Sequence, residues 1–481
     1  SLAHIASKIA IGGEALVVFN PLPWRMSNWV EADLELPQGW GSGEPGIKDA
    51  EEVESEVMEV EKGEREEVKS ARIGFTADLP PLGYKVYRMT PRGREPEEKI
   101  KEDGEEIETP FFKVTVDKGS GIARILDKES GLLVRGNELF IDDEIGDLYH
   151  HRSRFADLIK SESGEGLRYG SFKPKSFEIE RGALKWKIVF ESEYYCLTWP
   201  YRLKKRFPPR LYKYKTLDIH KEIILFRDIP RIEFITKIDN KYPNIRLSIK
   251  FDTGINRKVY FRETQFGVVP DPTEHLAKRE SAKPTGMPNF MSWFDLSDGT
   301  RGITFMNKGL PAVWIDGGAV YIRLLRSVGG LSADGIAGPL VPTQDALELK
   351  PYTFEYALQF HEGDWRQSEM YKKAREFDHI PLCIQSNSGG DMPVEFSFLE
   401  LSPNNLVLSA LKRAEGSDEM VLRFFETQGV ATKGEIKIFK QIKRATIVDL
   451  LEREEREIPA DGNQLNLEVN PFEIVTLKLQ L

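Results

Sequence analysis

The sequence contains little cysteine and little histidine, and it has no long hydrophobic run. Cys196 and Cys383 are its only cysteines in 481 residues, which excludes a disulfide framework and a cysteine-based metal cluster. No apolar run approaches the ~18 residues of a transmembrane helix, and no signal peptide is visible. We therefore expect no membrane partner and a cytoplasmic location.

An excess of basic charge is also missing. Lys and Arg number 67 against 77 Asp and Glu, which leaves a formal net charge of −10. Surfaces that bind nucleic acid normally show a basic excess, so we expect no nucleic-acid partner. The balance fits neutral, polar or sugar-like partners.

Motifs for metal or nucleotide chemistry are absent as well. None of the seven histidines belongs to an HxxxH or HExxH motif. His150 and His151 would point to opposite faces of a strand, so they cannot easily share one ion. Ile336 stands where a phosphate-binding loop needs its lysine, and no GxSxG elbow occurs. We expect no metal site within this chain.

Helical periodicity is rare, and most of the chain consists of short alternating strands separated by turns. Leu2, Ile5 and Ile9 have helical spacing before Gly12-Gly13, and a second helix is predicted over 364–378. The pattern predicts a mainly β fold with several two-sheet sandwiches. The expected segments are the end of a helix (1–12), a small β-sandwich (13–95), a large β-sandwich (96–382), a linker (383–392) and a C-terminal β-sandwich (393–481).

Two stretches are candidates for a binding site. IDDEIGDLYHHR, residues 141–152, places four acidic residues beside Tyr149, whose ring and hydroxyl suit a sugar. The alternative is a solvated loop anchored by one tyrosine. VYIRLLRSVGGLSADGIAGP, residues 320–339, ends a strand in a glycine-rich loop with Arg323 and Arg326 near its start. Such loops often carry sites, but these glycines also suit tight turns alone.

An ordered series of stretches resembles the C-terminal β region of glycoside hydrolase family 38, the retaining α-mannosidases. The series includes ALVVFNPLPW (15–24), LPPLGYKVYRM, FFKVTVDKGSGIARILDKESG, DEIGDLYHHR, and parts of 293–365 and 398–429, and it ends with NPFEIVTLKLQL. The resemblance covers essentially the whole chain. It implies that the large sandwich is a supersandwich of the galactose-mutarotase type.

In this family an N-terminal α/β barrel and a three-helix bundle precede the β domains. The resemblance implies that residues 1–10 are the last turns of that bundle, and that barrel and bundle are the partners of this chain. The family's zinc, its two His and two Asp ligands, and its Asp nucleophile all belong to the upstream part. No catalytic residue, metal ligand or cofactor is therefore expected here.

The resemblance also assigns roles to individual residues. Tyr149 lies where the family offers a tyrosine to bound mannose, with Asp147 as its neighbour. Asp334 stands about where relatives often have an arginine, which makes Arg326 the candidate substitute. Trp293 and Glu263 fit a structural role equally well. The implied function is to support the barrel and to line one wall of an α-mannoside pocket, without activity of the isolated chain.

Two other functions stay open. The supersandwich is also compatible with a mutarotase-like sugar epimerase, which needs a His–Glu acid/base pair across one sheet face. His220, His275 and His361 are candidates by residue type. The chain is alternatively a free-standing carbohydrate-binding or assembly subunit that pairs with a separate catalytic chain.

Overall fold

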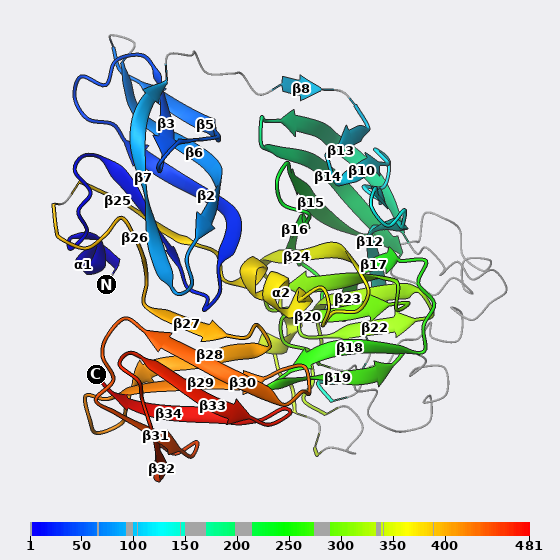
Figure 1. The fold of residues 1–481 in the computed structure, drawn as a ribbon. Coiled ribbons are helices and arrows are strands. Elements are labelled where there is room, and N and C mark those ends of the chain that lie inside the picture. The colour runs from blue at the N-terminus through cyan, green and yellow to red at the C-terminus, as the bar shows by residue number, and fades with distance from the viewer. Residues whose placement is uncertain are drawn as a thin grey trace, which may run out of the picture. The chain divides into compact units, whose positions relative to one another are not determined.

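Figure 1 shows the computed structural model, which describes residues 2–481 except 65–66, 93–99, 103, 145, 150–169, 198–213, 274–288, 333–337, 340 and 388. Strands dominate these described residues. Helical segments are restricted there to α1 (Leu2–Ala6), the 3-10 helix η3 (Asp345–Leu347) and α2 (Met370–Asp378). The expectation of a mainly β fold built from several sandwiches is confirmed. Among the described helices, none has the length and hydropathy that a membrane span requires.

The chain forms two compact units. The first comprises Ser1–Glu98, Thr264–Val268 and Tyr371–Leu481, and the second comprises Lys99–Glu263 and Val269–Met370. The first unit therefore combines the beginning of the chain with its end.

A small sandwich in the first unit is made of two sheets. Its larger sheet has the order β25 (Leu382–Ser386), β1 (Ala15–Asn20), β7 (Gly83–Arg92), β3 (Glu44–Lys48), β4 (Glu52–Val53), with β26 (Glu395–Ser397) also paired to β7. The facing sheet has the order β2 (Met26–Glu35), β6 (Val68–Leu79), β5 (Ser55–Lys62). Their inner faces bury a core that includes Leu16, Ile73, Phe75 and Tyr87.

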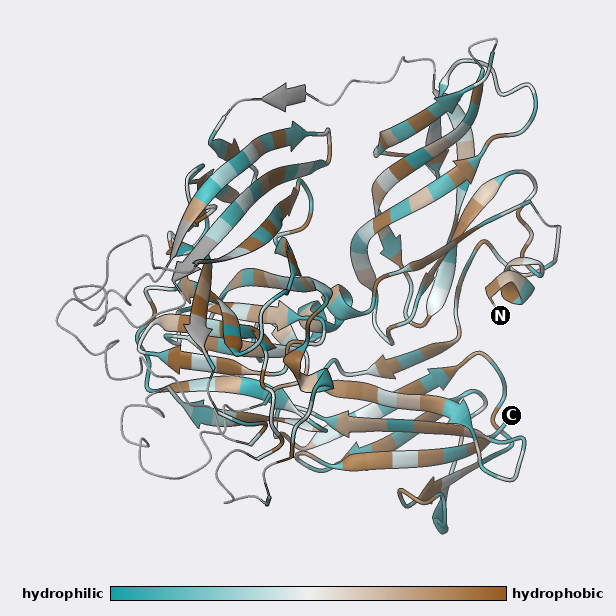
Figure 2. Ribbon diagram, turned by 180° about the vertical axis from the view of Figure 1, so that it is seen from behind, coloured by the Kyte–Doolittle hydropathy of each residue, from teal (hydrophilic) through white to brown (hydrophobic). Residues whose placement is uncertain are grey.

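The C-terminal sandwich of the same unit also has two sheets in the described residues. One has the order β27 (Leu399–Ser402), β30 (Thr432–Ile438), β33 (Gln464–Val469). The other has the order β28 (Leu406–Arg413), β29 (Met420–Glu426), β34 (Ile474–Gln480), β31 (Arg444–Val448), β32 (Glu454–Ile458). Strict alternation of buried and exposed residues along β30 shows the two-residue period of a strand with one core face. The same alternation of hydropathy is visible along many strands in Figure 2.

The second unit is a large sandwich of two sheets. One has the order β22 (Val313–Asp316), β23 (Ala319–Arg326), β17 (Ile245–Asp252), β12 (Leu133–Asp143), β11 (Ala123–Asp127), β10 (Phe112–Val116), β9 (Glu106–Glu108). The other has the order β19 (Gly267–Pro272), β18 (Val259–Thr264), β20 (Trp293–Ser297), β21 (Arg301–Asn307), β24 (Pro351–Glu362), β16 (Ile232–Asp239), β15 (Tyr214–Phe226), β14 (Lys185–Leu197), β13 (Gly170–Arg181), β8 (Ile100–Glu102).

Aromatic side chains join these two sheets. Phe251 of β17 meets Phe234 of β16 and Phe305 of β21 edge to face, with ring centroids 5.5 and 5.4 Å apart. A Cβ on Gly136 of β12 would lie 2.0 Å from the Phe251 ring, so this position requires glycine. Edge-to-face pairs of this kind add to the hydrophobic stabilisation of a core.

Three local expectations differ from the structure. Residues 382–386, expected to fall largely in a linker, form β25, whose Cys383 and Ile384 pair with Val18 and Val17 of β1. The first helix ends at Ala6, earlier than its apolar spacing indicates, because Ile9 forms a β-bridge with Met392.

The second helix starts at Met370 rather than near residue 364. Glu369 has φ 51°, in the left-handed region, which interrupts a helix at that point. The preceding residues form a turn in which Asp364 Oδ1 accepts the N–H groups of Arg366 and Gln367. The sequence pattern detects the helix but not this turn.

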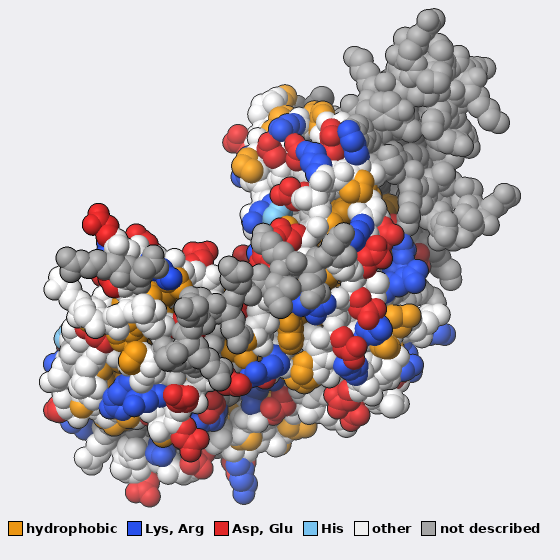
Figure 3. All heavy atoms as spheres, turned by 90° about the horizontal axis from the view of Figure 1, so that it is seen from above, with side chains coloured by type: hydrophobic (Ala, Val, Ile, Leu, Met, Phe, Trp, Pro, Cys, Tyr) orange, Lys and Arg blue, Asp and Glu red, His pale blue; other side chains and the backbone are white. Residues whose placement is uncertain are grey.

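Acidic and basic residues are present in similar numbers, 77 Asp and Glu against 67 Lys and Arg. Figure 3 shows acidic and basic side chains interspersed on the face that it displays. Exposed ion pairs such as Arg413–Asp418 and Lys433–Glu468 also bring opposite charges together at the surface. Faces that bind nucleic acid instead gather basic charge.

Candidate functional site

The candidate residues Tyr149, Asp147 and Arg326 lie where two strands of the seven-stranded sheet end. β12 and β23 are both antiparallel to β17, which lies between them. The two strands therefore run in the same direction and end at the same edge. Glu144 and residues 146–149 follow β12 there, and Arg326 is the last residue of β23.

Arg326 fastens this segment to the sheet. Its Nε donates to Oε2 of Glu144 at 2.7 Å, and its two terminal nitrogens donate to the backbone carbonyls of Leu148, at 3.2 Å, and of Asp147. The Glu144 side chain is completely buried, whereas that of Arg326 is 24% exposed. A buried carboxylate needs such a partner, because an unpaired buried charge is strongly destabilising.

Hydrogen bonds within the segment and to a neighbouring loop also stabilise its conformation. Glu144 Oε1 accepts the N–H of Gly146, and buried Asp147 accepts the N–H of Tyr149 on Oδ1, both at 2.9 Å. Leu148 N–H donates to the carbonyl of Gly330 in the following loop at 3.1 Å. The backbone at Asp147 to Tyr149 is thus positioned by side-chain and main-chain contacts together.

Tyr149 is the most exposed member of this group. It is 54% exposed, in contrast to Asp147 at 1%. The structure therefore brings Tyr149, Asp147 and Arg326 together, as the site prediction requires, although their contact with a sugar remains a prediction. Asp147 and Arg326 hold the loop through its backbone, and Tyr149 is the most exposed of the three residues.

Sequence reasoning missed the importance of Glu144. In the sequence, Glu144 is one of four clustered acidic residues. Its position directly after the last residue of a strand could have distinguished it from the other three. The side chains of Asp142 and Asp143, and residue Asp334, lie outside the described residues.

Trp293 and Glu263 are both buried in the large sandwich. Trp293 is fully buried, and its ring centroid lies 5.3 Å from that of Trp365. Glu263 Oε2 accepts the N–H and the hydroxyl of Ser292 at 2.9 and 2.5 Å. The ring contact leaves the indole N–H of Trp293 without a hydrogen-bond partner in the described structure.

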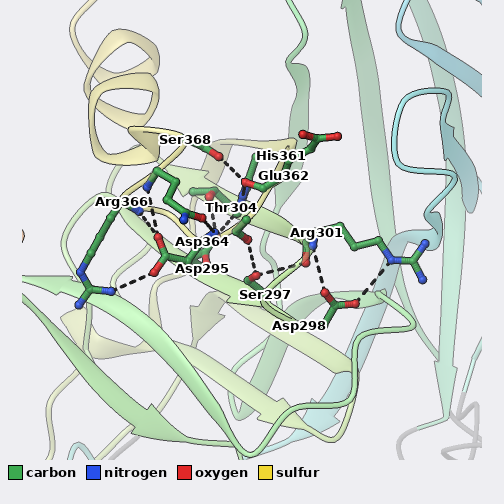
Figure 4. A network of polar contacts seen from close by, with 12 residues as sticks. Asp295, Ser297, Asp298, Arg301, Thr304, His361, Glu362, Asp364, Arg366 and Ser368 are labelled. Atoms are coloured by element: carbon green, nitrogen blue, oxygen red, sulfur yellow. Dashed lines mark hydrogen bonds and ion pairs between the residues drawn. The ribbon is translucent and has the colours of Figure 1, made fainter.

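A second polar group surrounds His361 (Figure 4). His361 Nε2 on β24 lies 2.7 Å from Oδ1 of Asp295 on β20, and Thr304 of β21 donates to the same oxygen at 2.7 Å. The side chains of His361 and Asp295 are 2% and 0% exposed. This buried group links β20, β21 and β24, and a side chain that is only 2% exposed is a poor acid/base candidate for an epimerase.

The strand opposite His361 makes room for its ring. Gly302 pairs with His361, and a Cβ there would lie 2.4 Å from Cε1 of the imidazole. Burial lowers the pKa of His361, but the hydrogen bond to Asp295 and its negative charge outweigh this effect, so the pKa is raised overall. Of the other two epimerase candidates, His275 lies outside the described residues. His220 lies on the solvent face of the ten-stranded sheet, with its Nε2 2.7 Å from Oε1 of Glu222.

The described residues do not form a zinc site. Within the ranges that the structure describes, no three His, Cys, Asp or Glu side chains gather in a group that could hold a metal ion. Tetrahedral zinc sites need three or four such ligands. No chemical step is therefore assigned to a metal on these residues.

Two family models match the chain over regions that contain the features described above. The model of the glycosyl hydrolases family 38 C-terminal domain matches residues 107–329, which include Tyr149 and Arg326. The model of the family 38 C-terminal beta sandwich domain matches residues 405–477. The chain belongs to glycosyl hydrolase family 38. It carries the C-terminal domains of that family.

Two curated relatives also match the chain. A putative mannosylglycerate hydrolase of Halalkalibacterium halodurans is 25% identical over 395 residues, which are 78% of this chain and 41% of the relative. Alpha-mannosidase G of Dictyostelium discoideum is 23% identical over 270 residues, which are 54% of this chain and 23% of the relative. This family 38 chain thus spans less than half the length of the curated relatives it matches.

Solved structures share the fold. An alpha-mannosidase from Enterococcus faecalis V583 has a TM-score of 0.75 at 17% identity, and a family 38 protein from Enterococcus faecalis has 0.77 at 18%. Both matches cover 100% of this chain but only 58% and 60% of the solved chains. The β architecture described above therefore matches the fold of one part of each of these longer solved chains.

Proposed function

We propose that this chain is the C-terminal β portion of a retaining α-mannosidase that hydrolyses terminal α-D-mannosides. The family models support the hydrolase class, and the names of the two curated relatives support a mannose-containing substrate. The chain packs against an N-terminal catalytic barrel and helical bundle, stabilises them and lines one wall of the sugar pocket. On its own it hydrolyses nothing.

One observation carries the assignment of the pocket wall, namely the exposed Tyr149 on a loop held by Arg326. A phenol offers an apolar ring and a hydrogen-bonding hydroxyl, which suit the two faces of a sugar. Arg326 and Asp147 keep the loop in place through its backbone, so they position the tyrosine rather than touch the sugar themselves. A preformed loop avoids the entropy cost of ordering it on binding.

Bond cleavage belongs to the other part of the enzyme in this proposal. A retaining glycosidase needs a nucleophile and an acid, with their carboxyl groups ~5–5.5 Å apart on either side of the scissile bond. The proposal places both carboxyl groups, and the ligands of the zinc ion of the complete enzyme, outside this chain.

The test measures hydrolysis of 4-nitrophenyl α-D-mannoside by the chain alone and by the chain assembled with the catalytic barrel of the same enzyme. We expect turnover only in the assembly. In that assembly, Tyr149→Phe should lower kcat/KM about fivefold or more, the effect of one lost hydrogen bond of about 1 kcal/mol. Leu148→Ala is the matched control, because the loop uses Leu148 through its backbone.

Two outcomes would reject the proposal. Turnover by the pure isolated chain would place catalytic groups within it. Equal kcat/KM for the Tyr149→Phe variant and the wild type would remove the tyrosine from the pocket wall, even if the assembly itself is active.

A further inference from the structure

A cavity of about 600 Å³ lies on the ten-stranded sheet of the large sandwich. Its lining comes from strands β13, β14, β15, β16 and β24. The volume falls within the range of about 300–1,000 Å³ that is typical of small-molecule sites. Its position on the sheet's outer face separates it from the apolar core between the two sheets.

Strand register explains why polar side chains gather there. Glu191 pairs with His220, His220 with Lys237, and Lys237 with Thr353, so the four residues form one row across four strands. Directly paired residues point to the same face of a sheet. The row spans three inter-strand spacings, or about 14 Å. Ile219, the neighbour of His220 along β15, points into the core instead.

His220 lies at the centre of a charged group. Its Nε2 is 2.7 Å from Oε1 of Glu222, and its Nδ1 is 3.3 Å from Oε1 of Glu191. Lys237 also donates to Glu222, at 3.0 Å. Burial raises the pKa of Glu222, but the hydrogen bonds from His220 and Lys237 lower it by more, so this carboxylate stays ionised.

An irregularity in β13 adds a further side chain to the cavity. The register between β13 and β14 shifts between Pro174 and Ser176, which leaves Lys175 as an extra residue. Lys175 reaches past β14 and binds Asp218 of β15. Bulges of this kind redirect side chains and occur preferentially beside functional sites. Lys175 and Asp218 thus form one border of the cavity.

The cavity is lined by charges of both signs, which disfavours the binding of a charged ligand. The cavity is lined by Lys175 and Lys237, and also by Glu191, Asp218 and Asp239, so both signs face it in nearly equal number. An anion would meet the three carboxylates, and a cation would meet the two ammonium groups. Hydroxyl groups match this mixture, because carboxylates accept their protons and ammonium groups donate to their oxygens.

We propose that this cavity is a binding site for a neutral sugar, with a single hexopyranose as its occupant. Glu191 and Asp218 accept hydrogen bonds from the sugar hydroxyls, and Lys237 donates to a hydroxyl oxygen. The site resides wholly in the large sandwich, so it needs neither the catalytic barrel nor the Tyr149 loop. The inference therefore goes beyond the mannosidase proposal and does not depend on it.

The test follows the imidazole C–H signals of the purified full chain by NMR during titration with methyl α-D-mannoside, D-glucose and methyl β-D-galactoside. The signal of His220 is assigned by its loss in His220→Gln. We expect it to shift saturably with at least one sugar, with a dissociation constant of about 1 mM, a weak affinity that suits an open site. A shift caused by inorganic phosphate but by none of the sugars would overturn the proposal.

Variants then locate the binding site by calorimetry. The double variant Glu191→Gln/Asp218→Asn should weaken sugar binding about fivefold or more, because neutral amides replace two ionised acceptors. Glu468→Gln, an exposed carboxylate on β33, is the control and should bind as the wild type does. Unchanged affinity in the double variant, or no His220 shift with any sugar, would refute the site.

Discussion

Glu144 and Arg326 form an ion pair between a completely buried carboxylate and a partly exposed guanidinium, with Nε and Oε2 2.7 Å apart. The pair joins the end of β12 to the end of β23. Through the same guanidinium, the backbone at Asp147 and Leu148 is fixed in place. The position of Tyr149 therefore depends on an interaction that does not involve its own side chain.

Loss of this pair should destabilise the large sandwich. Arg326→Met leaves the Glu144 carboxylate buried without its partner, and we expect a loss of about 3–5 kcal/mol in the free energy of unfolding by urea. Glu144→Gln in the same chain should recover part of this loss, since it removes the orphaned charge. A double-mutant cycle measures the coupling directly.

The control for this cycle is the exposed pair Arg413–Asp418, whose side chains are 72% and 92% exposed. Arg413→Met should change the free energy of unfolding by less than about 1 kcal/mol. If Arg326→Met costs no more than Arg413→Met, the buried pair does not hold the loop.

Lys221 should make the free energy of unfolding depend on pH above neutrality. It is completely buried, donates to the backbone carbonyl of Asn137, and has its pKa lowered by burial to about 7. In the unfolded chain the pKa returns to about 10.4. Between these values the unfolded chain binds a proton that the folded chain does not, so the free energy of unfolding should rise as pH increases from 7 to 10.

Lys221→Met should flatten this rise and should stabilise the protein at pH 7 by a few kcal/mol, because each unit of pKa shift corresponds to about 1.4 kcal/mol. Urea unfolding at pH 7, 8.5 and 10 measures both effects. Lys433→Met, at a side chain that is 89% exposed, should leave the slope as it is in the wild type. An identical slope in Lys221→Met and wild type would contradict the assignment.

His361 should make the free energy of unfolding change with pH in the opposite direction, falling as pH rises. Its pKa in the folded chain is raised above the usual 6.5, as a net effect of burial and of the stronger influence of Asp295. Below pH 6.5 both states are protonated and the full stabilisation is present. As pH rises through the folded pKa the proton is lost, and the stabilisation disappears with it.

His361→Gln should therefore cost about 1–3 kcal/mol at pH 5.5, and clearly less at pH 8.5. Thermal unfolding of wild type and variant at the two values gives the comparison. His379→Gln is the matched control, because its side chain is 43% exposed. A larger loss at pH 8.5 than at pH 5.5 would show that the sign is wrong.

A structural feature of this chain can be predicted from the sequence when the residues that determine it lie close together in the chain. Strands with one core face are predictable, because alternation such as that of β30 repeats over a few residues. The pairing of β25 with β1 is not, since it joins segments from the two ends of the chain. The acidic cluster around Tyr149 could be recognised as a candidate site in the sequence. The contact that holds this loop could not, because it links Glu144 to Arg326, 182 positions later. Alternation in β15 does place Lys221 on the core face beside Ile219 and Ile223, and this signal was available in the sequence.

Glu426 provides the last prediction, in the C-terminal sandwich. It is completely buried at the end of β29, and its Oε2 accepts the N–H groups of Gly429 and Phe472 at 2.7 and 3.0 Å. Its Oε1 accepts from Asn405 and from Gln428, both at 2.8 Å. Glu426→Gln would turn an amide N–H toward donors that need an acceptor, so we expect a loss of about 2–4 kcal/mol in the free energy of unfolding. Urea unfolding of this variant is compared with Glu468→Gln, and a difference below about 0.5 kcal/mol between them would mean that the carboxylate does not organise these loops.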